Sequence, residues 1–131
     1  MVARNNESSG NVAIGTRTLY SNTTGDNNTS VGIDSLGSNT AGDSNIAIGF
    51  NAMYSNTVGN GNIAIGAASS SGNFNNSILI GTFATATANN QFVVGSAGSH
   101  AGTITIESIT PNKTWTVRIN GVNYKIPLLT A

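Results

Sequence analysis

The first hundred residues repeat one pattern of apolar and polar positions. Each repeat contains a short run of apolar and small residues that ends at a glycine, followed by polar residues rich in Asn, Ser and Thr. The spacings between successive glycines are 17, 17, 17, 15 and 14 residues. These glycines are Gly15, Gly32, Gly49, Gly66, Gly81 and Gly95. A period of this length predicts a repeat architecture, in which each repeat is one structural unit.

The apolar run of each repeat predicts a short strand, and the glycine after it predicts a turn. A second short strand is expected at 18–21, 35–38 and 52–55, before Asn-Thr-x-Gly segments that turn the chain back. A helix is excluded because glycine recurs too often and no apolar stripe with a helical period persists. Two strands and two turns make one coil, so the sequence predicts an all-β protein with a parallel β-solenoid of about six coils over residues 10–101.

An asparagine stands four residues before each of the first four repeat glycines. In a solenoid, equivalent positions of successive coils lie about 4.8 Å apart, the distance between neighbouring strands. Asparagine side chains stacked at this distance can hydrogen-bond from coil to coil. The sequence therefore predicts an asparagine ladder made of Asn11, Asn28, Asn45 and Asn62.

The predicted strands are apolar on both faces. Ile14, Ile48 and Ile65 point to one face, and the residues directly before them point to the other, because side chains alternate along a strand. Strands of this kind are buried on both sides, and a thin roll can cover only one side by itself. A second copy of the chain is the simplest cover, since closed homo-oligomers are common. The residues predicted to contact that copy are Ala13, Ala47, Ala64, Leu79 and Val93.

The repeat resembles a known one. The phrase NIAIG, at 45–49 and again at 62–66, resembles the head repeats of trimeric autotransporter adhesins. The seventeen-residue form, with AMYSNTVG at 52–59, is similar to repeats in phage fibre proteins. The resemblance covers about residues 10–98 and implies a trimeric, left-handed parallel β-roll. The last two coils are shorter, and Ser77 and Gln91 replace the asparagine there.

The pattern changes after Gly102. Asn120-Gly121 is a strong signal for a two-residue hairpin turn, and counting outward pairs Trp115 with Ile126 and Val117 with Tyr124. An earlier strand at 103–109 would complete a three-stranded antiparallel β-meander within residues 102–131. This meander is expected to cap the solenoid, to seal a trimer or to dock on another protein. Its predicted contact residues are Trp115, Val117, Arg118, Ile119, Val122, Tyr124 and Ile126. Residues 1–9 are polar and are expected to be an arm that orders on a partner.

Composition argues against several functions. Charged residues make up 8% of the 131 residues and the formal net charge is zero, so nucleic acid is not an expected partner. No apolar run approaches the ~18 residues of a membrane span, and cysteine is absent. His100 is the only histidine. Asp26 and Asp43 occupy equivalent positions of two repeats, where they are expected either to form turns or to bind calcium. No catalytic, cofactor or metal site is predicted, and an enzyme is not expected.

Three functions are compatible with these features. The first is a virion structural protein: a short trimeric fibre, knob or decoration protein on a phage head or tail, exposed on the particle surface. It would contact other virion proteins through the meander or the arm, and a host-surface glycan or protein. The second is the head fragment of a bacterial trimeric surface adhesin, although no stalk or anchor pattern is present. The third is an ice-binding solenoid, for which Thr23, Thr40 and Thr57 are the only threonine column.

Overall fold

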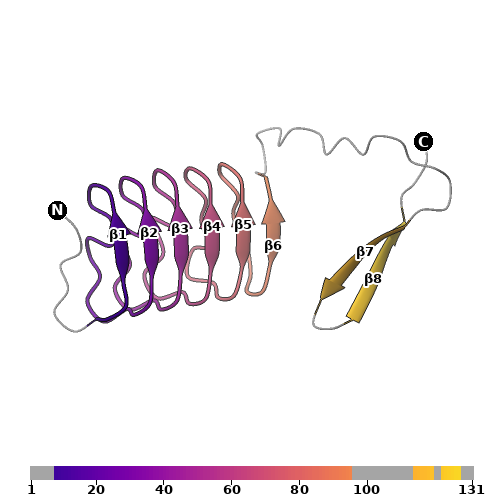
Figure 1. Ribbon diagram of the computed structural model, residues 1–131, viewed down its shortest axis with the longest axis horizontal. Coiled ribbons are helices and arrows are strands. Elements are labelled where there is room, and N and C mark those ends of the chain that lie inside the picture. Colours follow the sequence, from indigo (N-terminus) through magenta and orange to yellow (C-terminus); the bar gives the residue numbers. More distant parts are fainter. Residues whose placement is uncertain (1–7, 96–113, 120–121, 128–131) are drawn as a thin grey trace.

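The computed structural model describes residues 8–95, 114–119 and 122–127, and residues 8–95 form a parallel β-solenoid (Figure 1). Six three-residue strands lie side by side in sequence order in one sheet. They are β1 (Val12–Ile14), β2 (Thr29–Val31), β3 (Ile46–Ile48), β4 (Ile63–Ile65), β5 (Ile78–Ile80) and β6 (Phe92–Val94). The described residues contain no helix, so the predicted all-β solenoid is confirmed.

The register of the sheet follows the sequence repeat. Ala47 pairs with Ala64, Ala64 with Leu79, and Leu79 with Val93, so the pairing stays in phase where the repeat shortens. The strand-ending glycines allow the backbones of neighbouring coils to approach closely. Gly15 has a φ of 132°, and a Cβ there would lie 2.6 Å from the carbonyl oxygen of Gly32. Only glycine tolerates both this backbone angle and this close approach.

The predicted second strand is wrong. The segments at 18–21, 35–38 and 52–55 form turns, because Leu19, Leu36 and Met53 have positive φ angles of 48°, 49° and 51°. Left-handed residues interrupt an extended strand. The segments still bond from coil to coil: the backbone N–H of Leu19 donates to the carbonyl of Ser35 at 3.1 Å. The turns therefore supply a second line of hydrogen bonds along the solenoid without being strands.

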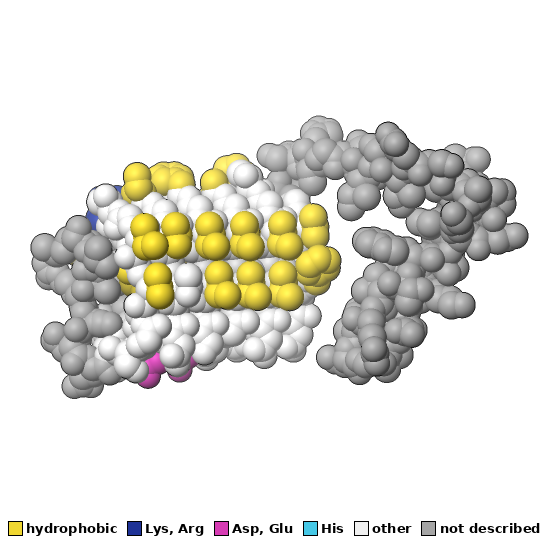
Figure 2. Space-filling model, in the orientation of Figure 1, with side chains coloured by type: hydrophobic (Ala, Val, Ile, Leu, Met, Phe, Trp, Pro, Cys, Tyr) yellow, Lys and Arg dark blue, Asp and Glu magenta, His cyan; other side chains and the backbone are white. Residues whose placement is uncertain are grey.

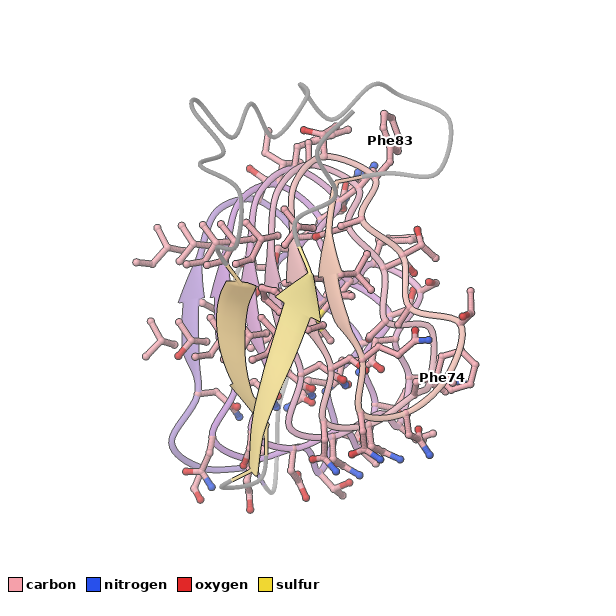
Figure 3. All side chains as sticks on the ribbon, turned by 90° about the vertical axis from the view of Figure 1, so that its right-hand side faces the viewer. Phe74 and Phe83 are labelled. Atoms are coloured by element: carbon pink, nitrogen blue, oxygen red, sulfur yellow. The ribbon has the colours of Figure 1, made fainter. Side chains whose placement is uncertain are left out.

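The core is narrow and consists of small and medium side chains. Leu19, Leu36, Met53 and Leu79 are its largest apolar members, and all are fully buried. The remaining buried apolar residues are Ala47, Ala52, Ala64, Ala84 and Ala86. Seen end-on, the strands form one wall of the coil, and turns and loops form the others (Figure 3). Small interior residues are needed because these walls lie close together.

The small-residue column lies inside the coil, not on a surface that faces another copy. Ala47, Ala64 and Leu79 have no exposed surface, and Ala13 and Val93 pack against the same core. The expectation that this column is the face left for a partner is therefore wrong. The exposed side of each strand is the opposite one, which carries the isoleucines.

The C-terminal part contains an antiparallel hairpin of β7 (Thr114–Ile119) and β8 (Val122–Pro127). Its register pairs Trp115 with Ile126 and Val117 with Tyr124, as counted outward from the predicted turn. The third strand of the predicted meander, at 103–109, lies outside the described residues. The three-stranded meander as a whole stays a prediction.

Candidate functional site

The most prominent surface of the solenoid is an apolar sheet face. Figure 2 shows two yellow rows that run along β1–β6. The first row holds the residue directly before each strand-ending glycine, and the second holds the residue two positions earlier. The apolar sheet face consists of Val12, Ile14, Val31, Ile46, Ile48, Ile63, Ile65, Ile78, Ile80, Phe92 and Val94.

Side chains of this face are substantially exposed in the single chain. Ile14 is 60% exposed, and Ile48 in the middle of the sheet is still 39% exposed. Thr29 is the one polar residue in the second row. Six strands of three residues give a flat area of about 24 Å by 10 Å, before side chains are counted. A continuous apolar patch on a regular surface is typical of an interaction site.

The predicted asparagine ladder is confirmed. The backbone N–H of Asn45 donates to Oδ1 of Asn28 at 3.0 Å, and the N–H of Asn62 donates to Oδ1 of Asn45 at 3.0 Å. The amide groups also bond to each other, since Nδ2 of Asn45 donates to Oδ1 of Asn28 at 3.1 Å. Asn28, Asn45 and Asn62 are fully buried. Their burial is tolerated because the ladder satisfies their polar atoms.

A second asparagine ladder runs beside the first, and sequence reasoning missed it. Nδ2 of Asn39 donates to Oδ1 of Asn22 at 2.8 Å, and Nδ2 of Asn56 donates to Oδ1 of Asn39 at 3.0 Å. All three residues are fully buried. The signal for this ladder is present in the sequence as the Ser-Asn-Thr triple that recurs every seventeen residues at 21–23, 38–40 and 55–57.

The two ladders meet at one glycine carbonyl in each of three successive coils, Gly25, Gly42 and Gly59. The carbonyl of Gly42 accepts Nδ2 of Asn28 at 2.8 Å and Nδ2 of Asn39 at 2.9 Å. The carbonyl of Gly59 accepts Nδ2 of Asn45 at 2.8 Å and Nδ2 of Asn56 at 3.1 Å. In these coils, two asparagines and one glycine therefore form a single structural unit.

The aspartate column is also used within the solenoid. Oδ1 of Asp43 accepts the backbone N–H of Asp26 at 2.7 Å, and Oδ1 of Asn60 accepts the N–H of Asp43 at 2.7 Å. No group of three His, Cys, Asp or Glu side chains that could hold a metal occurs among the described residues. The turn-forming interpretation of Asp26 and Asp43 accounts for these contacts.

The threonine column points its hydroxyls along the solenoid. Oγ1 of Thr23 donates to the carbonyl of Thr40 at 2.9 Å, and Oγ1 of Thr40 donates to the carbonyl of Thr57 at 3.0 Å. These hydroxyls therefore help to hold neighbouring coils together, which accounts for the column without a ligand.

One ion pair lies on the turns that follow the first two strands. Nε of Arg17 donates to Oδ1 of Asp34 at 2.6 Å, and Nη2 donates to Oδ2 at 2.5 Å. This two-point contact lowers the pKa of the Asp34 carboxyl below its ordinary value, against the opposing effect of desolvation. The same contact raises the pKa of Arg17. The Arg17 side chain is 60% exposed and that of Asp34 is 11% exposed.

The predicted contact residues fall into two groups. Ala13, Ala47, Ala64, Leu79 and Val93 line the inside of the solenoid. Trp115, Val117, Arg118, Ile119, Val122, Tyr124 and Ile126 lie on the β7–β8 hairpin. His100 lies outside the described residues. The exposed isoleucine rows, which were not predicted as contact residues, are the surface that the structure leaves uncovered.

No protein-family model matches the chain, and no curated protein or solved structure matches it. Within the described part of the chain, no helix has the length and apolar character needed to cross a bilayer.

Proposed function

We propose that the protein is a structural component of a virus particle, a short trimeric fibre, knob or decoration protein on a phage head or tail. The apolar sheet face on an otherwise polar, hydrogen-bonded rod is the observation that carries the proposal. Such a rod performs a mechanical and spacing role, because its repeating polar side chains are engaged in holding one coil to the next. The resemblance of its NIAIG repeats to fibre and adhesin heads supports the choice of function.

The apolar sheet face is covered by two further copies of the chain in this proposal. Its residues recur along the whole length of the solenoid, so copies aligned side by side would match each other coil for coil. In a closed three-fold assembly, each chain presents the same face to the symmetry axis. The choice of three copies rests on the resemblance to trimeric head repeats.

The C-terminal hairpin offers a second set of contacts for the trimer. The β7–β8 hairpin carries Trp115, Arg118 and Tyr124, residue types that favour interfaces. We therefore assign the segment 103–129 to sealing the trimer or joining it to the particle, and the solenoid to the outward part.

Native mass spectrometry and light scattering on the full chain test the assembly. A trimer is expected, and a folded monomer at all concentrations would contradict the proposal. A chain ending at Gly102 is expected to keep its β-sheet circular dichroism spectrum and to lose the trimer or its place in the particle. An unchanged trimer that still enters the particle would remove the hairpin from the proposal.

Location separates the virion from the bacterial surface. Quantitative mass spectrometry of purified particles is expected to find the chain in copy numbers that are multiples of three. The NIAIG repeat also favours a second candidate, the head of a bacterial trimeric surface adhesin. Recovery of the chain from the bacterial cell surface, in cells free of phage, would favour that candidate.

A further inference from the structure

A shallow depression lies on the turns of the first three coils, away from the strands. Its side chains come from equivalent positions of successive coils, two, five and six residues after the strand-ending glycine. The lining side chains are Arg17, Tyr20, Ser21, Asp34, Ser38 and Tyr54. The buried core separates these turns from the strand wall, so copies packed on the apolar sheet face leave the depression open.

Two tyrosines form its aromatic walls. Tyr20 is 37% exposed and Tyr54 is 50% exposed, and they stand two coils, about 10 Å, apart along the solenoid. Gly37 holds the same position in the coil between them. A Cβ at Gly37 would lie 3.0 Å from Cδ2 and Cε2 of Tyr54. The Tyr54 ring therefore leans over Gly37, and a side chain there would displace it.

The polar rim of the depression carries no net charge. Arg17 and Asp34 neutralise each other through their two-point contact. Two of the five guanidinium hydrogens are used there, and the side chain is exposed enough to donate others. The hydroxyls of Ser21 and Ser38 line the same space and make no hydrogen bond among the described residues. Exposed aromatic faces beside neutral hydrogen-bonding groups suit a ligand with one apolar side and several hydroxyls.

We propose that this depression binds an uncharged sugar ring of a surface glycan. The C–H face of a pyranose stacks on the Tyr54 ring, and its hydroxyls bond to Asp34, Arg17 and the two serines. An anionic ligand fits less well, because Asp34 already holds the guanidinium and places a carboxylate on the rim. This proposal rests on the proposed role of the protein at a particle surface and names the site and ligand class that the role would use.

Titration of the full-length protein with maltohexaose, cellohexaose and chitohexaose, followed by tyrosine fluorescence and by NMR, tests the site. At least one of these neutral oligosaccharides is expected to bind. Tyr54→Ala and Tyr20→Ala are expected to weaken that binding about fivefold to tenfold, as expected for the loss of one stacked ring. Phe83→Ala is the matched control, because this 55% exposed ring projects from a different coil (Figure 3).

Gly37→Ala keeps every lining side chain but moves the Tyr54 ring, and it is expected to weaken binding as Tyr54→Ala does. Equal binding by wild type, Tyr54→Ala and Gly37→Ala, or no binding of any of the three oligosaccharides, overturns the proposal. Polysialic acid is the anionic comparison. If it binds better than the neutral sugars and Arg17→Gln abolishes that binding, the assignment to neutral sugars is wrong. Light scattering on the same samples reports the trimer separately, so failure of the sugar site and failure of the assembly are distinguishable.

Discussion

Asparagine side chains are buried along one corner of the coil, and isoleucine side chains are exposed on the apolar sheet face. Most soluble proteins show the reverse arrangement. Asn28, Asn45 and Asn62 are fully buried, whereas Ile14, Ile48 and their equivalents are exposed. Buried asparagine is uncommon, and long rows of exposed isoleucine are rarer still. The difference shows that hydrogen-bond satisfaction along the stack determines the interior here, and that apolar side chains are left exposed on the strand face.

The corner is stable because each amide bonds to the equivalent residue of a neighbouring coil and to a backbone carbonyl in the corner. A side chain that satisfies its polar atoms in this way does not incur the full cost of burial. The apolar sheet face has no other layer of the same chain to cover it, because the solenoid is only one coil thick. Its burial therefore depends on association, and the corner's does not. The predictions below test this division.

Asn45→Ala is expected to have the largest effect on the folding of a single chain. It removes the acceptor of the Asn62 N–H and one of two donors to the Gly59 carbonyl. The loss of these buried hydrogen bonds, with the Asn62 N–H left unpaired, should lower the free energy of unfolding by about 2–5 kcal/mol. Denaturant unfolding measures the change. Asn60→Ala, which removes one exposed bond to Asp43, is the control and should cost about 1 kcal/mol or less.

Ala64→Leu is expected to be the next most damaging. Ala64 is fully buried between Ala47 and Leu79 of the neighbouring strands. Added methylene groups in so narrow an interior should cost about 1–3 kcal/mol. Because the clash is within one chain, the loss in melting temperature should be the same at every protein concentration. Ser55→Leu, on the exposed surface, should melt like the wild type, and equal losses for both variants would contradict the interior placement.

The double variant Ile48→Ser, Ile65→Ser should separate association from folding. Both side chains are exposed in the single chain, so unfolding of the monomer should change by about 0.5 kcal/mol or less per site. Association should be lost, because two apolar contacts are removed from every copy. Sedimentation over a range of concentrations measures this. Val58→Ser, at an exposed residue off the apolar sheet face, should leave the proposed trimer intact.

The Arg17–Asp34 pair should give the smallest effect, seen only in acid. The pKa of Asp34 is lowered in the folded chain, so its contribution is present above the ordinary carboxyl pKa of 3.8. That contribution is lost as the pH falls below 3.8 and through the lower folded value. The wild type should therefore lose more melting temperature than Asp34→Asn between about pH 5 and pH 2. Parallel melting curves for the two proteins would show that the pair contributes nothing.

The sequence alone determined the solenoid, its register and the first asparagine ladder. Those features follow from period: the same residue types return at 17-residue intervals, and stacked coils bring equal positions together. The pairing of β7 with β8 followed equally from a local turn signal and from counting outward. Local chemistry and periodicity suffice where each interaction joins equivalent or neighbouring residues.

The tertiary structure decided which face of each strand is inside. Alternation shows that Ala47 and Ile48 point in opposite directions, but it does not say which direction is the interior. That choice depends on the distance between the walls of the coil. Leu36 and Met53 have positive φ angles, and their side chains point inward from the turn wall and are fully buried. In these coils, small residues such as Ser30 and Ala47 fill the space that Leu36 and Met53 leave on the strand side. The depression beside Tyr54 likewise exists only because three successive coils stack in register, which places Tyr20, Gly37 and Tyr54 in one column.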